Sequence, residues 1–409
     1  MTMNAPAVIF GAGNIGRSFI GQLFWRAGYA TLFVDTNHAL IHALNREKAY
    51  RVIIRRADAA DETLHVENVG GLCADDQAAV SDAVARAPLV ATSVGKNALP
   101  FVIPAVARGL MLRQAQTPGK PLDIILAENI RDGADFFRRS LAPLLPPDFP
   151  IDKMVGIVET SIGKMVPIIS AEDRARDPLA VYAEAYNRLI VDKKAFKNPL
   201  PPIPGLHAVD AIKAFVDRKL FVHNLGHAAA AYLGYRYDPS FRHIYEALEV
   251  IDIREQVRAA MEQASAALNA CYPADLSMRS LGEHIDDLLI RFANRALADT
   301  LHRVGRDLRR KLDRNDRVAG AMLLAERFGC PYDHIAEVYA AACSFRATDE
   351  EGLLFKDDAL LIAETNGLLP ETALARVSRL SCAIPAEANI IRAVRSCSRQ
   401  AADELLVHA

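Results

Sequence analysis

Apolar residues in the first 160 positions form short runs that alternate with longer stretches of helical composition. The runs at 7–10, 31–35, 88–94, 122–127 and 154–158 are rich in valine, isoleucine and leucine. Short continuous apolar runs of this kind are typical of strands that are buried on both faces of a parallel sheet. The pattern therefore predicts an α/β domain of Rossmann type, with a doubly wound parallel sheet.

A proline-rich passage at 198–205 interrupts this alternation, and we interpret it as the connector between two domains. The predicted domains are 1–197 and 198–409. Beyond the connector, helix-length segments dominate, so the second domain is predicted to be mostly α-helical. The predicted helical segments are 208–233, 240–268, 278–299, 315–328, 332–343, 351–364, 369–378 and 384–407.

Composition and charge argue against several classes of function. A formal net charge of −2 over 409 residues gives no electrostatic reason to expect binding to nucleic acid or to an anionic membrane. The sequence contains neither a secretory signal nor an apolar stretch of about 18 residues. The six cysteines are scattered, as reduced cysteines of a cytosolic protein are. We therefore expect a cytoplasmic protein.

The first predicted strand runs into Gly-Ala-Gly-Asn-Ile-Gly, which opens a helix. Gly11 permits the turn, Gly13 lets the backbone approach a pyrophosphate, and Gly16 lets the helix pack closely on the strand. Asp35 ends the second strand, where it can accept hydrogen bonds from both ribose hydroxyls of an adenosine. Because a 2′-phosphate would meet a like charge there, NAD is predicted rather than NADP. The predicted cofactor-binding residues of this region are Gly11, Ala12, Gly13, Asn14, Ile15, Gly16 and Asp35.

Three further candidates follow later strands, at the sheet edge where ligands of such domains lie. Gly95 would let the nicotinamide side of the cofactor come close, although a plain loop glycine would look the same. Glu128 and Asn129 follow the fifth strand. Asn129 suits either a helix N-cap or a catalytic amide.

Residues 219–227, Lys-Leu-Phe-Val-His-Asn-Leu-Gly-His, have helical composition. At about 100° per residue, Lys219, His223, His227 and Asn224 share roughly one face of an α-helix. A helix with a solvated polar face would show the same pattern. The two histidines have a spacing that can bind zinc, but no glutamate lies between them and no third ligand is evident nearby. Packing or proton balance is therefore favoured for His223, and no metal is predicted.

Taken together, these motifs resemble those of the polyol-specific long-chain dehydrogenases. The resemblance runs nearly end to end and is greatest to the members that act on mannitol 1-phosphate. It implies a metal-independent, nicotinamide-dependent enzyme whose active site lies between a Rossmann domain and a helical domain. The motifs that carry it are residues 11–17, Ala-Glu-Asn at 127–129, Lys219-x4-Asn224-x2-His227, Arg291-Phe-Ala-Asn294, and the basic segment 299–312.

The resemblance implies a role for each polar residue. Lys219 would be the general base, and burial would move its pKa toward neutral pH. Asn224 and Asn129 would form an oxyanion hole, and His227 would orient the substrate oxygen.

Substrate recognition is implied to lie in the basic segment. Arg303 and Lys311 match positions that contact the polyol chain, and Arg306 could grip a phosphate. For Arg309 and Arg310, a solvated basic segment is an equal alternative. Where many members carry Asp-Arg, this chain has Gly163-Lys164, which leaves the exact substrate open.

The expected reaction is the NAD-dependent oxidation of a sugar alcohol phosphate, D-mannitol 1-phosphate to D-fructose 6-phosphate. The alternatives are a dehydrogenase for an unphosphorylated polyol, a tagaturonate or fructuronate reductase, and a non-catalytic NAD-binding sensor. The expected partner is a small polyol or polyol phosphate, bound by a monomer or a small homo-oligomer.

Overall fold

The computed structural model describes residues 5–56, 59–128, 130–167, 169 and 171–407. The chain forms two compact units, Met1–Val216 and Asp217–Ala409. The division therefore differs from the one predicted at the proline-rich passage 198–205. The reason is β11 (Leu206–Val209), which follows the prolines and pairs in parallel with β10 (Leu189–Asp192), so that the passage belongs to the first unit.

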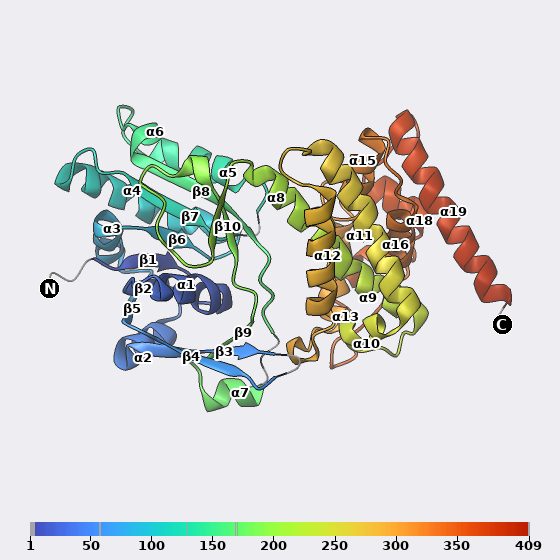
Figure 1. Ribbon diagram of the computed structural model, residues 1–409, viewed down its shortest axis with the longest axis horizontal. Helices are drawn as coiled ribbons and strands as arrows, with labels where there is room; N and C mark the ends of the chain where they lie inside the picture. The colour runs from blue at the N-terminus through green and yellow to red at the C-terminus, as the bar shows by residue number, and fades with distance from the viewer. Residues whose placement is uncertain (1–4, 57–58, 129, 168, 170, 408–409) are drawn as a thin grey trace. The chain divides into compact units, whose positions relative to one another are not determined.

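The first unit is built on an eight-stranded sheet with the order β11-β10-β8-β7-β6-β1-β2-β5 (Figure 1). All neighbouring strands pair in parallel except β8 and β10. Since β1 lies between β2 and β6, the chain changes direction across the sheet at β1, which is the position where ligands of such sheets bind. The other strands are β1 (Ala7–Phe10), β2 (Thr31–Asp35), β5 (Val69–Cys73), β6 (Val90–Thr92), β7 (Leu122–Leu126) and β8 (Val155–Ile162).

Hydrophobic cores lie on both faces of this sheet. Ala7 and Ile9 of β1 enter one core, and Val8 and Phe10 enter the other, because successive strand residues point to opposite faces. One face is covered by η1 (Gly16–Gly21), α1 (Gln22–Arg26) and α2 (His38–Glu47), and the other by α3 (Gln77–Arg86), α4 (Leu99–Gln116) and α5 (Gly133–Leu141). The predicted doubly wound Rossmann-type sheet is confirmed.

A smaller sheet belongs to the same unit. In it, β3 (Ala49–Arg55) pairs in antiparallel fashion with β4 (Glu62–Glu67) and in parallel with β9 (Val181–Glu184). The remaining short elements are η2 (Ala142–Leu144), α6 (Ile151–Met154), α7 (Ala171–Arg176) and η3 (Lys193–Ala195).

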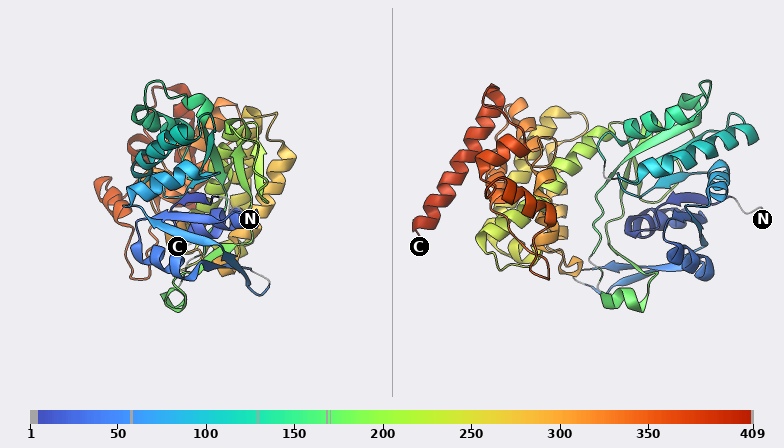
Figure 2. Two further views of the ribbon diagram at one scale, coloured as in Figure 1. Left: turned by 90° about the vertical axis from the view of Figure 1, so that its left-hand side faces the viewer. Right: turned by 180° about the vertical axis from the view of Figure 1, so that it is seen from behind.

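The second unit is helical, as predicted, and residues 217–407, all of which are described, contain no strand. At its centre is α9 (Leu225–Tyr237), whose residues Ala228–Ala231 are fully buried. A side chain at Gly226 would collide with the Met261 sulfur, so α9 and α11 (Ile251–Cys271) pack closely. Figure 2 shows these helices from behind, with α19 (Pro385–Val407) at the end of the chain. The others are α10 (Ile244–Glu249), α12 (Met278–Phe292), η5 (Arg295–Leu297), α13 (Leu301–Gly305), α14 (Leu308–Lys311), α15 (Ala319–Arg327), α16 (Asp333–Cys343), α17 (Lys356–Glu364), α18 (Pro370–Thr372) and η6 (Ala373–Val377).

Candidate active site

The turn between β1 and η1 carries the predicted nucleotide-binding glycines. Gly11 has φ = +95° and donates its N–H to the Val34 carbonyl oxygen at 2.8 Å. A side chain at Gly11 would lie 2.6 Å from the Ser93 carbonyl oxygen, and one at Gly16 would collide with the Gly11 carbonyl. A side chain at Gly13 would meet no atom within 4 Å. The exposed Gly13 therefore leaves the space that a pyrophosphate needs at the start of a helix.

Asp35, the last residue of β2, accepts a hydrogen bond from this turn. Its Oδ2 accepts the N–H of Ala12 at 2.7 Å, and its Oδ1 accepts the N–H of Asn37 at 2.9 Å. Each carboxylate oxygen keeps a second acceptor position, and the residue is half-buried rather than enclosed. The carboxylate therefore fits a ribose with two hydroxyl donors. Asn14 and Ile15 form the first residues of the helix that follows.

Arg17 is a residue that the sequence reasoning missed. Its Nε donates to the Ala12 carbonyl oxygen at 2.7 Å and its Nη1 to the Leu179 carbonyl oxygen at 2.5 Å. The Tyr50 hydroxyl donates to the Arg17 carbonyl oxygen at 2.8 Å. Burial lowers the pKa of the guanidinium, and nearby Tyr50 and Asp35 partly oppose this shift. Arg17 thus fastens the glycine turn to the segment before β9. Its place directly after the third glycine was the available signal.

Glu128 holds the loop that follows β6. Its Oε1 accepts the N–H of Val94 at 3.0 Å, and its Oε2 accepts the N–H of Gly95 at 2.7 Å. Burial raises the pKa of this carboxyl, and the two backbone hydrogen bonds oppose the rise. Gly95 has φ = +82°, and a side chain there would meet no atom within 4 Å. Glu128 therefore fixes the shape of this loop, and its predicted role in binding the cofactor stays a prediction. Asn129 lies outside the described residues, and its role stays a prediction.

The predicted catalytic residues of the second unit begin in a π-helical turn. Helix α8 (Ile212–Arg218) passes into η4 (Lys219–Asn224), which leads into α9. In a π-helix the backbone hydrogen bonds link residue i to i+5. The α-helical spacing of 100° per residue predicted for this stretch therefore does not hold between Lys219 and Asn224. They lie one wider turn apart, in a conformation that occurs frequently at functional sites.

The surroundings of the Lys219 side chain disfavour its charged, protonated form. Desolvation, followed by the nearby Arg317 and Arg310, lowers the pKa of Lys219 from 10.5 to about 7, and Asp316 partly opposes this shift. A lysine with a pKa near 7 is divided between its neutral and charged forms at neutral pH. That property suits a group that must take up and release a proton in each turnover.

Two histidines share an aromatic neighbour, Phe292. The His227 ring stacks on Phe292 with centroids 4.6 Å apart, and the His223 ring meets it edge-on at 5.4 Å. Burial, together with Arg291 and Lys219, holds the pKa of His223 well below its ordinary value. His223 is therefore neutral at physiological pH and does not add a charge beside Lys219.

Asp299 is the second site residue that the sequence reasoning missed. Its Oδ2 lies 3.5 Å from His227 Nε2, and its Oδ1 forms an ion pair with Arg303. Only 7% of the Asp299 side chain is exposed. Desolvation acts to raise its pKa, but His227 and Arg303 outweigh it and the net shift is downward. Asp299 is thus a buried, charged carboxylate that holds two predicted site residues. The i,i+4 spacing of Asp299 and Arg303 was the available signal.

The basic segment divides into buried and exposed cations. Lys311 is buried and donates to the carbonyl oxygens of Val304 and Arg306, and desolvation keeps its pKa well below the ordinary value. Arg306 is exposed, with its guanidinium 5.3 Å from the centroid of the Phe355 ring. Lys311 therefore supports the loop from which Arg306 projects. The two other arginines of the segment are exposed and ion-paired, Arg309 with Glu364 and Arg310 with Asp307.

Lys164, which replaces the arginine of the expected Asp-Arg pair, is buried in the first unit. Its Nζ donates to the Tyr186 carbonyl oxygen at 2.7 Å and to Asn187 Oδ1 at 3.3 Å. The same nitrogen lies 5.3 Å from the centroid of the Phe19 ring. Its charge is thus engaged within the fold, next to Gly163.

A Rossmann-type unit with an acidic residue at the end of β2, followed by a helical unit with a half-buried lysine of lowered pKa, is typical of a dinucleotide-dependent dehydrogenase. Residues 5–205 match the family model of the mannitol dehydrogenase Rossmann domain, and residues 211–380 match that of the mannitol dehydrogenase C-terminal domain. The chain belongs to the mannitol dehydrogenase family. It is an oxidoreductase that acts on CH–OH groups, and its Rossmann domain is consistent with NAD as the cofactor.

Two solved structures have the same fold over nearly the whole chain. One is mannitol 2-dehydrogenase of Pseudomonas fluorescens in a ternary complex with NAD and D-mannitol. It has a TM-score of 0.76 and 17% sequence identity, and the match covers 98% of this chain and 93% of that one. The other is a D-sorbitol dehydrogenase in substrate-free form, with a TM-score of 0.76, 16% identity, and coverage of 98% and 95%.

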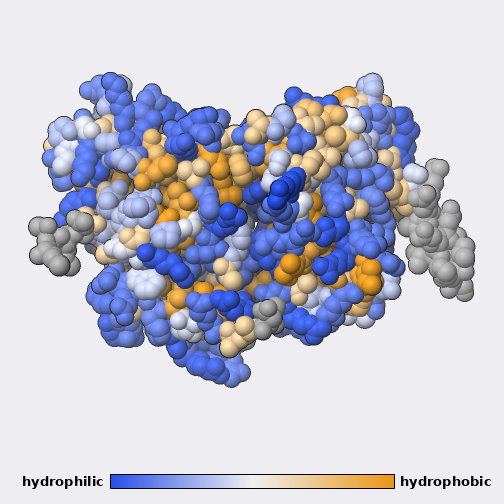
Figure 3. Space-filling view, in the orientation of Figure 1, coloured by the Kyte–Doolittle hydropathy of each residue, from blue (hydrophilic) through white to orange (hydrophobic). Residues whose placement is uncertain are grey.

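Among the described residues, no helix combines the length and the apolar character needed to cross a bilayer. The face shown in Figure 3 is mostly hydrophilic, with hydrophobic residues scattered over it.

Proposed function

We propose that this protein oxidises a sugar alcohol phosphate to a ketose phosphate, with NAD as the hydride acceptor and Lys219 as the general base. D-Mannitol 1-phosphate and D-fructose 6-phosphate are the proposed substrate and product. The observation that carries the proposal is the pKa of Lys219, which burial lowers to about 7. A dehydrogenase needs a group that accepts the hydroxyl proton near neutral pH, and an ordinary surface lysine is almost fully protonated there.

Each candidate site residue has one role in this proposed reaction. Neutral Lys219 takes the hydroxyl proton of the substrate. A nicotinamide held by the glycine turn would supply the acceptor for the hydride that leaves the carbon bearing this hydroxyl. The Asn224 amide, and that of Asn129, donate hydrogen bonds to the oxygen on which negative charge develops. His227, held by Asp299, accepts a hydrogen bond from a substrate hydroxyl. The products are a ketone, a protonated Lys219 and NADH.

Phosphate recognition is assigned to the basic segment. Arg306 is exposed, and its guanidinium can grip two phosphate oxygens at once. The Arg303 side chain is 38% exposed, so that it can contact the polyol chain while it pairs with Asp299. Gly163 and Lys164 supply no carboxylate where many members have one, which favours a substrate that is anchored by its charged end.

The test is a comparison of ketoses in the direction of NADH oxidation. Fructose 6-phosphate, fructose, tagaturonate and fructuronate are assayed with NADH and with NADPH, using the native protein and the Lys219→Ala variant. We expect turnover to be fastest with fructose 6-phosphate and NADH, and to be lost in Lys219→Ala. Faster turnover of fructose would identify an unphosphorylated polyol, and faster turnover of a uronate would identify a hexuronate reductase. NADH binding without turnover of any of the four would favour a sensor.

A further inference from the structure

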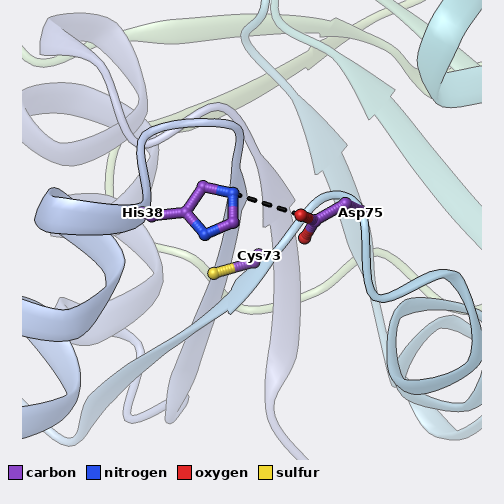
Figure 4. A group of neighbouring side chains, drawn as sticks. All are labelled: His38, Cys73 and Asp75. Carbon is purple, nitrogen blue, oxygen red and sulfur yellow. Dashed lines mark ion pairs between the residues drawn. The ribbon is translucent and has the colours of Figure 1, made fainter.

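A histidine, a cysteine and an aspartate that have no role in the proposed function lie together at the edge of the main sheet (Figure 4). His38 is the first residue of α2, Cys73 is the last residue of β5, and Asp75 lies in the turn before α3. One potential ligand atom from each lies within 4.8 Å of the others. His38 Nε2 is 3.2 Å from Asp75 Oδ2, and the Cys73 thiol lies beside the imidazole ring.

The backbone fixes the positions from which these side chains project. The Asn37 side chain caps α2 by accepting the N–H of Leu40 at 3.0 Å. The Asp76 side chain caps α3 by accepting the N–H of Ala79 at 3.1 Å. The N–H of Asp76 also bonds to the Cys73 carbonyl oxygen at 3.1 Å. The three ligand groups therefore start from well-defined strand and helix ends, and only side-chain rotation is needed to close them around an ion.

The combination of ligand atoms selects the kind of ion. An imidazole nitrogen, a thiolate sulfur and a carboxylate oxygen are the ligand types of Zn²⁺, whereas Mg²⁺ and Ca²⁺ prefer oxygen alone. Three protein ligands leave a fourth tetrahedral position for water. The existing contact between His38 and Asp75 opposes metal binding only weakly, since exposed ion pairs contribute about 0–1 kcal/mol. We propose that His38, Cys73 and Asp75 form a binding site for a zinc-type divalent metal ion.

The site adjoins the part of the sheet that receives the adenosine of NAD. Cys73 is the register partner of Asp35 on the neighbouring parallel strand, so their side chains share one face of the sheet. The N–H of Ala74 also donates to the Asp35 carbonyl oxygen at 3.0 Å. A dication beside Asp35 attracts the carboxylate that would otherwise accept the ribose hydroxyls. The metal therefore weakens NADH binding, and by thermodynamic linkage NADH weakens metal binding by the same factor.

Metal binding is tested on the full chain, with its thiols kept reduced. Titration with Zn²⁺ by calorimetry should give one site, and Co²⁺ should give a near-ultraviolet thiolate-to-cobalt absorption band. His38→Ala, Cys73→Ser and Asp75→Asn should each weaken Zn²⁺ binding by at least about tenfold, the scale on which loss of even an outer-sphere partner acts. The cobalt band should disappear in Cys73→Ser. His42→Ala on the same helix and Cys382→Ser, both exposed positions, are the matched controls and should bind as the native chain does.

The coupling is tested by titrating NADH with and without saturating Zn²⁺, in the native chain and in His38→Ala. We expect Zn²⁺ to raise the Kd of NADH in the native chain and not in the variant. Equal Zn²⁺ affinity in all three ligand variants would overturn the site, and an unchanged NADH affinity would overturn the coupling. The coupling rests on the use of NAD, but no arm of the experiment depends on turnover. A failure of the proposed substrate would therefore leave both results readable.

Discussion

Asp299 lies against His227, with its Oδ2 3.5 Å from the imidazole Nε2, and both side chains are largely buried. A carboxylate can only accept hydrogen bonds, so the nitrogen that faces it carries the proton. In the tautomer with its proton on Nε2, the Nδ1 of His227 is a hydrogen-bond acceptor, which is what a substrate hydroxyl requires. Asp299 also forms an ion pair with Arg303, so that one carboxylate positions a second candidate site residue as well.

Asp299 is therefore predicted to be a positioning residue. Asp299→Asn removes the charge that faces His227 and weakens the charge-assisted hydrogen bond from Arg303. Such a bond is worth about 1.5–3 kcal/mol, which corresponds to a loss of about 10- to 100-fold in kcat/KM. NADH affinity should be unchanged, because no cofactor-binding residue is affected. Steady-state kinetics and an NADH titration separate these quantities.

The control for Asp299 is Asp286→Asn, which removes an exposed carboxylate that pairs with Arg258 at 2.6 Å. It should leave kcat/KM within a factor of about two, as exposed ion pairs contribute little. If Asp299→Asn lost stability but kept its kcat/KM, the carboxylate would serve the fold and not the orientation of His227.

The glycines of the nucleotide-binding turn should respond differently to the same substitution. A methyl group at Gly13 meets no atom within 4 Å, so Gly13→Ala should fold with a nearly unchanged Tm. It should nevertheless weaken NADH binding at least about tenfold, because the methyl group occupies the space that the pyrophosphate needs. A methyl group at Gly16 collides with the Gly11 carbonyl, so Gly16→Ala should lose stability outright. Thermal unfolding and NADH titration measure the two effects, and normal NADH affinity in Gly13→Ala would contradict the assignment.

The parts of the fold that follow from side-chain periodicity were predictable. The strands that carry Gly11, Asp35 and Glu128 are short apolar runs, and burial on both faces leaves such runs few alternatives. The two units of the structure meet at 216/217 and not at the predicted 197/198, because a proline-rich passage resembles a linker, whereas the strand at 206–209 that returns to the sheet has only four residues. Its pairing with β10 depends on tertiary contacts that no local pattern encodes.

The site was predictable in its residue types and less so in its geometry. The motif containing Lys219 and Asn224 was visible, but the π-helical turn was not, because π- and α-helical turns use the same residues. Glu128 was visible as a polar residue after a strand, but its two bonds to the backbone of another loop required the fold. Arg17 was overlooked because its partner Leu179 is distant in sequence. Asp299 was overlooked because its partners are other side chains, His227 and Arg303, rather than the substrate.

Glu128 offers a test of how far loop shape controls cofactor affinity. In Glu128→Gln, one oxygen can still accept from Val94 or Gly95, but the amide nitrogen turns a donor toward the other N–H. A buried N–H without an acceptor costs about 1–3 kcal/mol. We therefore expect a lower free energy of unfolding and weaker NADH binding, both within that range. Denaturant unfolding and NADH titration check this, and an unchanged NADH affinity would show that the loop tolerates the loss.

Lys219 should produce a visible ionisation in the pH dependence of activity. Because its pKa is about 7, kcat/KM for alcohol oxidation should rise with pH through about 7 and then level off as the neutral base predominates. Lys219→Arg should lose the activity and with it the rise of kcat/KM with pH, since a guanidinium is not deprotonated at these pH values. A profile that stays flat from pH 6 to pH 9 in the native protein would remove Lys219 from the role of base.

The same pKa predicts that Lys219 lowers the stability of the folded chain at neutral pH. Between about pH 7 and pH 10.5 the unfolded state, with its ordinary lysine pKa, binds more protons than the folded state does. The free energy of unfolding therefore increases as pH rises through that window. Below the window, the desolvated ammonium of Lys219 destabilises the folded state by its full amount. Lys219→Met, which keeps the length of the side chain without its charge, should raise the Tm at pH 7 and abolish turnover. The gain in Tm should shrink toward pH 10, and thermal unfolding across this pH range measures it. A lysine retained at such a cost in stability is expected where catalysis requires it and packing does not.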